Sequence, residues 1–205
     1  MWGAASQPCP VAETHISIQK GQYSPTPGAT FDLNDFAANL VSRGKEQPLC
    51  SMRTTEVEHG NVFVSTESLS QLFNQKAKRG ASKISGIKIE IEKGTVHLKG
   101  KIRKGIDVPF DIEGSVATDG RNLILHATKV HAQGIPIKGV LNMLGMHLSS
   151  LMGSGEMSGV SAKEDTLVFE PAKISQVRGK IASATVSDKG LAVSFVSNKP
   201  QNARR

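Results

Sequence analysis

Histidines are the residues in this chain whose type most directly suggests metal binding or acid–base catalysis. The six histidines are spread singly along the sequence, and His97 lies among lysines that would repel a metal cation. His126 and His131 share a predicted strand but are five positions apart, so we expect their side chains on opposite faces of the sheet. The histidines therefore predict no metal site.

Carboxylates provide the other candidate chemistry. Asp107, Asp111 and Glu113 share one face of a predicted strand. This pattern is more typical of cross-strand pairs with neighbouring lysines than of catalytic acids. The sequence contains no G-x-S-x-G, H-E-x-x-H or phosphate-binding loop. We therefore predict a protein that is not an enzyme, with no catalytic residues and no cofactor.

Positive charge is concentrated in residues 76–104. The whole chain carries a net charge of +7, and this window contains ten Lys and Arg against Glu90 and Glu92. No aromatic residue lies between Gln75 and Pro109, so stacking on nucleic-acid bases is unsupported and a nucleic-acid partner is unlikely. Charge density alone suits an anionic membrane surface. A solvated face that keeps the protein soluble is the alternative. The cations predicted to contact anionic headgroups are Lys88, Lys99, Lys101 and Arg103.

The most apolar segment, residues 134–152, has helical spacing and is rich in methionine. Four of the six methionines lie between Met143 and Met157, and methionine suits surfaces that fit variable apolar ligands. Ordinary core packing is the alternative, but this helix is apolar around more than half its circumference and only one sheet is predicted to cover it. As a groove for an apolar ligand, the face consists of Ile137, Val140, Leu141, Met143, Leu144, Leu148, Leu151 and Met152.

Alternating residues predict the elements around this helix. Residues 87–104 alternate apolar and charged positions about the Lys93-Gly94 turn, and further strands are expected at 106–116 and 122–131, joined by Asp119-Gly120. Helices are expected at 30–44 and 65–80, a short strand at 61–64, and a Gly/Ser-rich loop at 153–165. Closing strands are expected at 167–169, 180–187 and 191–196.

These elements predict an α+β fold with one domain over residues 30–197. Residues 1–29 would form a flexible tail and residues 198–205 a disordered one. Cys9 and Cys50 are in no metal-binding motif, and a disulfide and two free thiols are equally compatible with their positions. The chain shows no complete signal peptide and no predicted transmembrane helix.

Several of these segments resemble the LmeA-like phospholipid-binding family, which is similar to the tubular lipid-binding (TULIP) superfamily. The resemblance rests on Val62-Phe-Val-Ser-Thr, Leu69-Ser-Gln-Leu-Phe-Asn, the 87–100 hairpin, Val108-Pro-Phe-Asp-Ile-Glu-Gly, Leu123-Ile-Leu and Gly134-Ile-Pro-Ile. It covers residues 61–152, with a weaker echo at 167–196. It implies a strongly twisted antiparallel sheet wrapped as a half-tube around a long amphipathic helix.

The resulting functional hypothesis is non-enzymatic binding or carriage of a lipid, such as a phospholipid, between that helix and the curved sheet. The protein would act peripherally at an anionic membrane surface, in a bacterial cell envelope. The alternative is a structural or interaction domain whose apolar helix face docks a protein partner.

Overall fold

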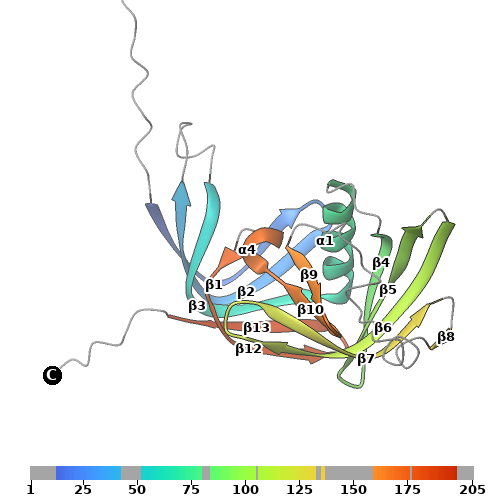
Figure 1. Cartoon of the computed structure of the whole chain (residues 1–205). Helices are drawn as coiled ribbons and strands as arrows, with labels where there is room; N and C mark the ends of the chain where they lie inside the picture. The colour runs from blue at the N-terminus through green and yellow to red at the C-terminus, as the bar shows by residue number, and fades with distance from the viewer. Residues whose placement is uncertain are drawn as a thin grey trace, which may run out of the picture.

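The described part of the chain forms two mainly antiparallel sheets and two short helices (Figure 1). The computed structural model describes residues 13–42, 52–79, 84–104, 106–132, 135–136, 159–175 and 177–197. Both sheets and helix α1 contribute to one continuous apolar core. Its largest fully buried side chains are Ile112, Leu125 and Leu167.

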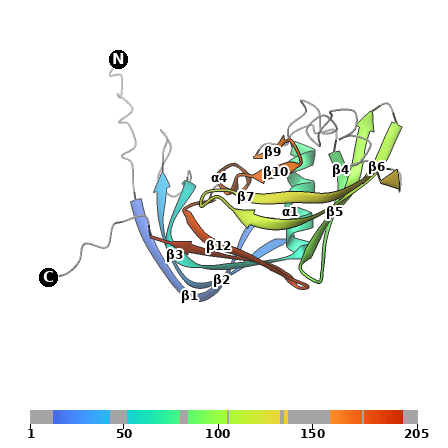
Figure 2. The ribbon, with the colours of Figure 1, turned by 60° about the horizontal axis from the view of Figure 1, so that its bottom comes forward.

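Sheet A contains strands from the beginning and from the end of the described chain. Its order is β1-β2-β3-β13-β12, and β11 lies parallel to β3. The strands are β1 (Glu13–Thr26), β2 (Ala29–Ser42), β3 (Met52–Ser65), β11 (Val177–Arg178), β12 (Lys180–Ser187) and β13 (Gly190–Val196). The long strands β1 and β2 curve strongly (Figure 2).

Sheet B contains the strands whose alternation was clearest in the sequence. Its order is β4-β5-β6-β7-β10-β9, with β8 paired to β7. The strands are β4 (Ile84–Glu92), β5 (Thr95–Lys104), β6 (Ile106–Thr118), β7 (Leu123–Ala132), β8 (Ile135–Pro136), β9 (Val160–Lys163) and β10 (Thr166–Phe169). The predicted Lys93-Gly94 turn is confirmed, since both residues have positive φ, as a type I′ hairpin requires.

Helix α1 (Thr66–Arg79) confirms the helix predicted at 65–80 and covers the free edge of sheet B. The Asn74 side-chain amide accepts a hydrogen bond from the Ile87 N–H at 2.8 Å and donates one to the Ile87 carbonyl. Ser70 Oγ accepts a hydrogen bond from the Ile89 N–H at 2.8 Å. These polar side chains take the place of a neighbouring strand, so the backbone groups on the outer edge of β4 have hydrogen-bond partners. The second helix, α4 (Pro171–Ile174), follows β10.

The two sheets are also joined directly where their edges meet. The Ile181 N–H on β12 donates a 2.9 Å hydrogen bond to the carbonyl of Gly120, in the β6–β7 turn. Phe73 on α1 packs edge-to-face against Phe169 on β10, with ring centroids 5.4 Å apart. Helix α1 and β10 therefore close one side of the space between the sheets, and the β6–β12 contact closes another.

The predicted fold class is wrong. The structure is mostly β, with two sheets and only two short helices among the described residues, and no long helix lies within a wrapped sheet. Of the helix expected at 134–152, Ile135–Pro136 form β8, and residues 137–152 lie outside the described part of the chain. The loop expected at 153–165 contains strand β9.

The helix expected at 30–44 is strand β2, and a β-bulge explains the error. Asp35 has a φ of 47°, and the register of β2 against β3 shifts between Asn34 and Ala37. Phe31 is buried before the bulge and Phe36 after it, so the apolar positions change parity and imitate helical spacing. Residues 13–26, expected in a flexible tail, form β1 because they pair along nearly the full length of β2.

Candidate ligand-binding site

A cavity of about 310 Å³ lies between the two sheets. Thirty of the described residues line it; among these, Gln22, Thr55 and Ser175 are polar, Tyr23 carries a hydroxyl, and none is charged. The remaining lining residues are Ile16, Ile18, Phe31, Leu33, Phe36, Leu40, Val62, Val64, Leu69, Leu72, Phe73, Ile89, Ile91, Val96, Leu98, Val116, Leu123, Leu125, Phe169, Pro171, Ile174, Val177, Val186, Leu191, Val193 and Phe195. This surface is suited to alkyl groups and unsuited to a charged group.

The alternation of both sheets places these side chains inside. On β4 and β5, Ile89, Ile91, Val96 and Leu98 are buried and face the cavity, whereas the residues between them are charged or polar and face outward. Helix α1 adds Leu72 through its apolar face. The cavity is therefore built from the same inward positions that form the core.

The cavity extends along most of sheet A. At one end, Tyr23, Phe31 and Val64 lie side by side on β1, β2 and β3. At the other end, Leu40 and Val177 both pair with Thr55. Nine positions of β3 separate Val64 from Thr55, which corresponds to about 30 Å of extended strand.

Exposure differs between the two ends. Tyr23 is 43% exposed, and it is the only large apolar cavity residue, among those described, that the structure leaves exposed. Its ring packs edge-to-face against Phe31 with centroids 6.3 Å apart. Gln22 beside it is also exposed. Thr55 and Ser175, at the far end, are half-buried. The Gln22–Tyr23 end is therefore the more open end.

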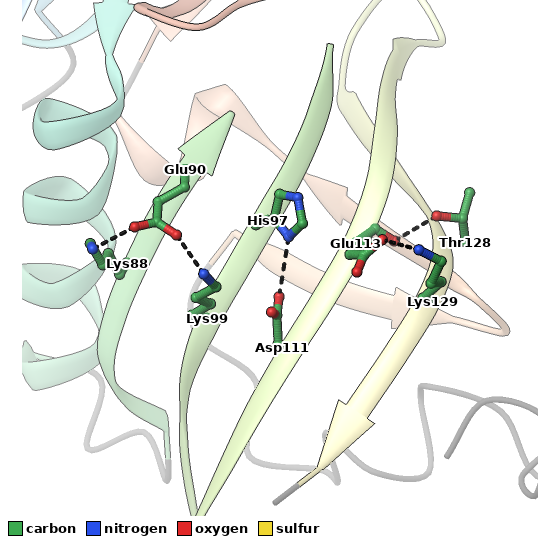
Figure 3. Close-up of polar contacts among 8 residues, drawn as sticks. All are labelled: Lys88, Glu90, His97, Lys99, Asp111, Glu113, Thr128 and Lys129. Carbon is green, nitrogen blue, oxygen red and sulfur yellow. Dashed lines mark hydrogen bonds and ion pairs between the residues drawn. The ribbon is translucent and has the colours of Figure 1, made fainter. Parts of the chain in front are cut away.

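The outer face of sheet B carries two rows of titratable side chains across four strands (Figure 3). Paired residues of β4, β5, β6 and β7 follow one another in each row. The rows consist of Glu90, His97, Glu113 and Lys129, and of Lys88, Lys99, Asp111 and His131. The predicted pairing of the β6 carboxylates with neighbouring cations is confirmed for Glu113, which bonds Lys129 at 2.7 Å, and for Asp107, which bonds Arg103 at 3.2 Å. Asp111 lies opposite Lys99 but contacts His97 at 3.7 Å instead.

Ion pairs in these rows shift the pKa values of their members. Hydrogen bonds from Lys88 and then Lys99 lower the pKa of Glu90 to about 2. The Glu90 hydrogen bond raises the pKa of Lys99. A hydrogen bond from Lys129 lowers the pKa of Glu113. The groups therefore stay charged at neutral pH and neutralise one another, which is the behaviour of a structural network.

The four cations predicted to contact headgroups are all on or near this face, but most have acidic partners. Lys88 and Lys99 both bond Glu90, and Arg103 bonds Asp107. Lys101 is exposed and makes no ion pair within the described residues. Three of the four predicted headgroup cations therefore have an acidic partner, and Lys101 has none among the described residues.

His126 and His131 share the outer face of sheet B, contrary to the expected opposite faces. The register of β6 against β7 shifts after Glu113, so that Glu113 pairs with Lys129 and Gly114 with Ala127. The bulged Thr128 adds one residue between the histidines and reverses the alternation. The described residues contain no group of three or more His, Cys, Asp or Glu side chains placed to hold a metal ion.

The lipid-binding residues predicted from the sequence, Ile137 to Met152, lie outside the described residues, as do Cys9 and Cys50. The apolar lining of the cavity is built mainly from strands, with Leu69, Leu72 and Phe73 from α1. Its sequence signal is the alternation of apolar residues in 87–98, which predicts a buried face of a sheet and not a cavity. No helix in the described part of the chain is long and apolar enough to cross a membrane.

Comparisons with known protein families, with curated proteins and with solved structures found no match to this chain.

Proposed function

We propose that this protein binds and carries an apolar ligand, such as a lipid, in the cavity between its two sheets. The observation that carries the proposal is the lining, which is apolar except for three residues and the Tyr23 hydroxyl, and contains no charge. Each ligand methylene transferred from water to such a surface contributes about 0.8 kcal/mol. Binding of this kind requires no catalytic residue.

The apolar lining itself supports a ligand over an empty cavity. Apolar surface left in contact with water is unfavourable by about 25 cal/mol per Å². A bound apolar ligand removes the lining from water, which favours a binding protein.

We further propose that the protein takes its ligand from a membrane surface. Lys101 projects from the outer face of β5 without an acidic partner among the described residues. An unpaired cation close to an anionic bilayer contributes about 1 kcal/mol. The protein would then work peripherally, at the surface of a membrane of the cell envelope.

Native mass spectrometry with organic extraction, on protein purified without detergent, tests the ligand directly. We expect a co-purifying apolar molecule in one-to-one ratio, or uptake of one from lipid vesicles. A protein that stays free of ligand after incubation with vesicles would contradict the proposal.

A charged substitution in the cavity provides the matched test. Leu69 lines the cavity from α1, and Gln71 is exposed on the same helix. We expect Leu69→Lys to reduce ligand uptake at least tenfold, because its ammonium group would lie against the apolar lining, while Gln71→Lys leaves uptake unchanged. Circular dichroism verifies that both variants are folded. Equal uptake by two folded variants would contradict the proposed site.

Vesicle sedimentation with phosphatidylglycerol tests the membrane contact. Lys101→Glu should weaken binding more than Lys180→Glu, which makes the same charge change at an exposed position of β12. Equal effects would show that only net charge matters.

A further inference from the structure

We propose that the cavity holds one long alkyl chain whose polar end group stays outside, at the opening beside Gln22 and Tyr23. This inference rests on the proposed function and specifies the class of its ligand: an amphiphile that inserts a single chain. The volume of the cavity, its lack of charge and the position of its opening each support a part of it.

The volume of the cavity favours a single alkyl chain. A cavity of about 310 Å³ lies at the small end of ligand pockets. It is too small for the two chains of a diacyl lipid side by side.

The lining excludes a charged end group from the interior. None of the described lining residues is charged, and the polar ones lie at the two ends: Gln22 at one, Thr55 and Ser175 at the other. Removing an ion from water without a partner costs several kcal/mol. A carboxylate or phosphate must therefore remain in solvent.

The position of the opening decides which end of the cavity the end group occupies. Gln22 and Tyr23 are exposed, whereas Thr55 and Ser175 are half-buried. A tyrosine has an apolar ring with a polar tip, which suits the boundary between an alkyl chain and water. The chain therefore enters past Tyr23 and ends near Thr55, where uncharged hydroxyls meet its terminal methyl group.

Binding of saturated fatty acids of increasing length to the delipidated full chain tests this inference. The readout is displacement of a fluorescent fatty acid. We expect affinity to increase about fourfold per added methylene until the chain fills the cavity, and then to stay constant. A diacyl phosphatidylglycerol should bind more weakly than the best single-chain acid.

A variant that fills the far end of the cavity tests where the alkyl chain ends. Thr55→Phe should shift the plateau to a shorter acid, because the added ring shortens the apolar path. Thr185→Phe, on an exposed position of β12, should leave the plateau unchanged. Should Thr55→Phe fail to fold, Ser175→Phe serves at the same end, with exposed Ser183→Phe as its control.

The outcomes separate this inference from the proposed function. Tighter binding of the diacyl lipid, or the same plateau in wild type and Thr55→Phe, would overturn the single-chain inference while leaving an apolar-ligand carrier. Binding of neither single-chain nor diacyl ligands would overturn both.

Discussion

Asn74 stabilises the protein through its side-chain amide, which serves as a strand partner for Ile87. Both hydrogen bonds are made to backbone groups at the edge of sheet B. An unsatisfied backbone group costs about 1–3 kcal/mol. We expect Asn74→Leu to lower the free energy of unfolding by about 2–6 kcal/mol for the two groups, measured by urea denaturation.

The control for this prediction is Asn34→Leu, on an exposed position of β2. A surface change of this kind is within about 0.5 kcal/mol. An equal loss in both variants would show that Asn74 does not act through the strand edge.

Glu90 makes stability depend on pH. Its pKa is lowered to about 2 by Lys88 and Lys99. A carboxyl group with a lowered folded-state pKa stabilises the protein above its unfolded pKa, and this contribution is lost as pH falls toward the folded value. We therefore expect wild type to exceed Glu90→Gln in stability above about pH 5, by about 1 kcal/mol after solvent screening, with the difference vanishing near pH 2.

Thermal unfolding across this pH range, with Glu92→Gln as the control, checks the Glu90 prediction. Glu92 is on the same strand and makes no side-chain hydrogen bond among the described residues. A stability difference between wild type and Glu90→Gln that does not change with pH would contradict the assigned ion pair.

At the scale of the elements, Gly60 makes room for the bulge in β2. It has a φ of 133°, and a Cβ there would lie 2.6 Å from Phe36 Cα. We expect Gly60→Ala to destabilise the protein by more than the roughly 1–3 kcal/mol typical of a strained backbone position alone. Chemical denaturation measures the loss.

Two causes act at Gly60: its positive φ and the close approach of a Cβ to Phe36. Gly94→Ala separates them, because Gly94 also has positive φ but a Cβ there meets nothing within 4 Å. We expect it to cost only about 1–2 kcal/mol. If both variants lost the same stability, the close approach of β2 to β3 would not constrain residue 60.

The elements that could be predicted from the sequence are those with uninterrupted alternation. Strands β4, β5 and β6 and their turns follow directly from Ile87 to Val116, because each inward position is two residues from the next. Strand β2 could not be read in this way, since a bulge at Asp35 depends on a partner strand that a local pattern does not contain.

The cavity could not be predicted because its lining comes from distant segments. Phe31, Ile89 and Leu191 share one space only after β13 pairs with β3 and α1 covers β4. The apolar character of each strand was visible in the sequence, and it predicted burial. Whether the buried faces of the strands pack together or leave a cavity between them depends on how the two sheets are placed.

At the scale of the whole molecule, both sheets share one core, and we expect them to unfold together. Val193 is buried on β13 and packs within the core that includes Ile112 of sheet B. Val193→Ala should therefore lower the hydrogen-exchange protection of β6 as much as that of β3. Val196→Ala, 39% exposed on the same strand, should change neither. Loss of protection confined to sheet A would show two independent folding units.

Pairing of β3 with β13 has a consequence for synthesis on the ribosome. Val64 pairs with Leu191, so one side of β3 has no partner until the ribosome has added about 125 more residues, which takes roughly 10 s at 5–20 residues per second. Throughout that interval the nascent chain carries an open, apolar strand edge that can pair with other chains. We therefore expect the nascent chain to be most prone to pair with other chains before β13 has been synthesised.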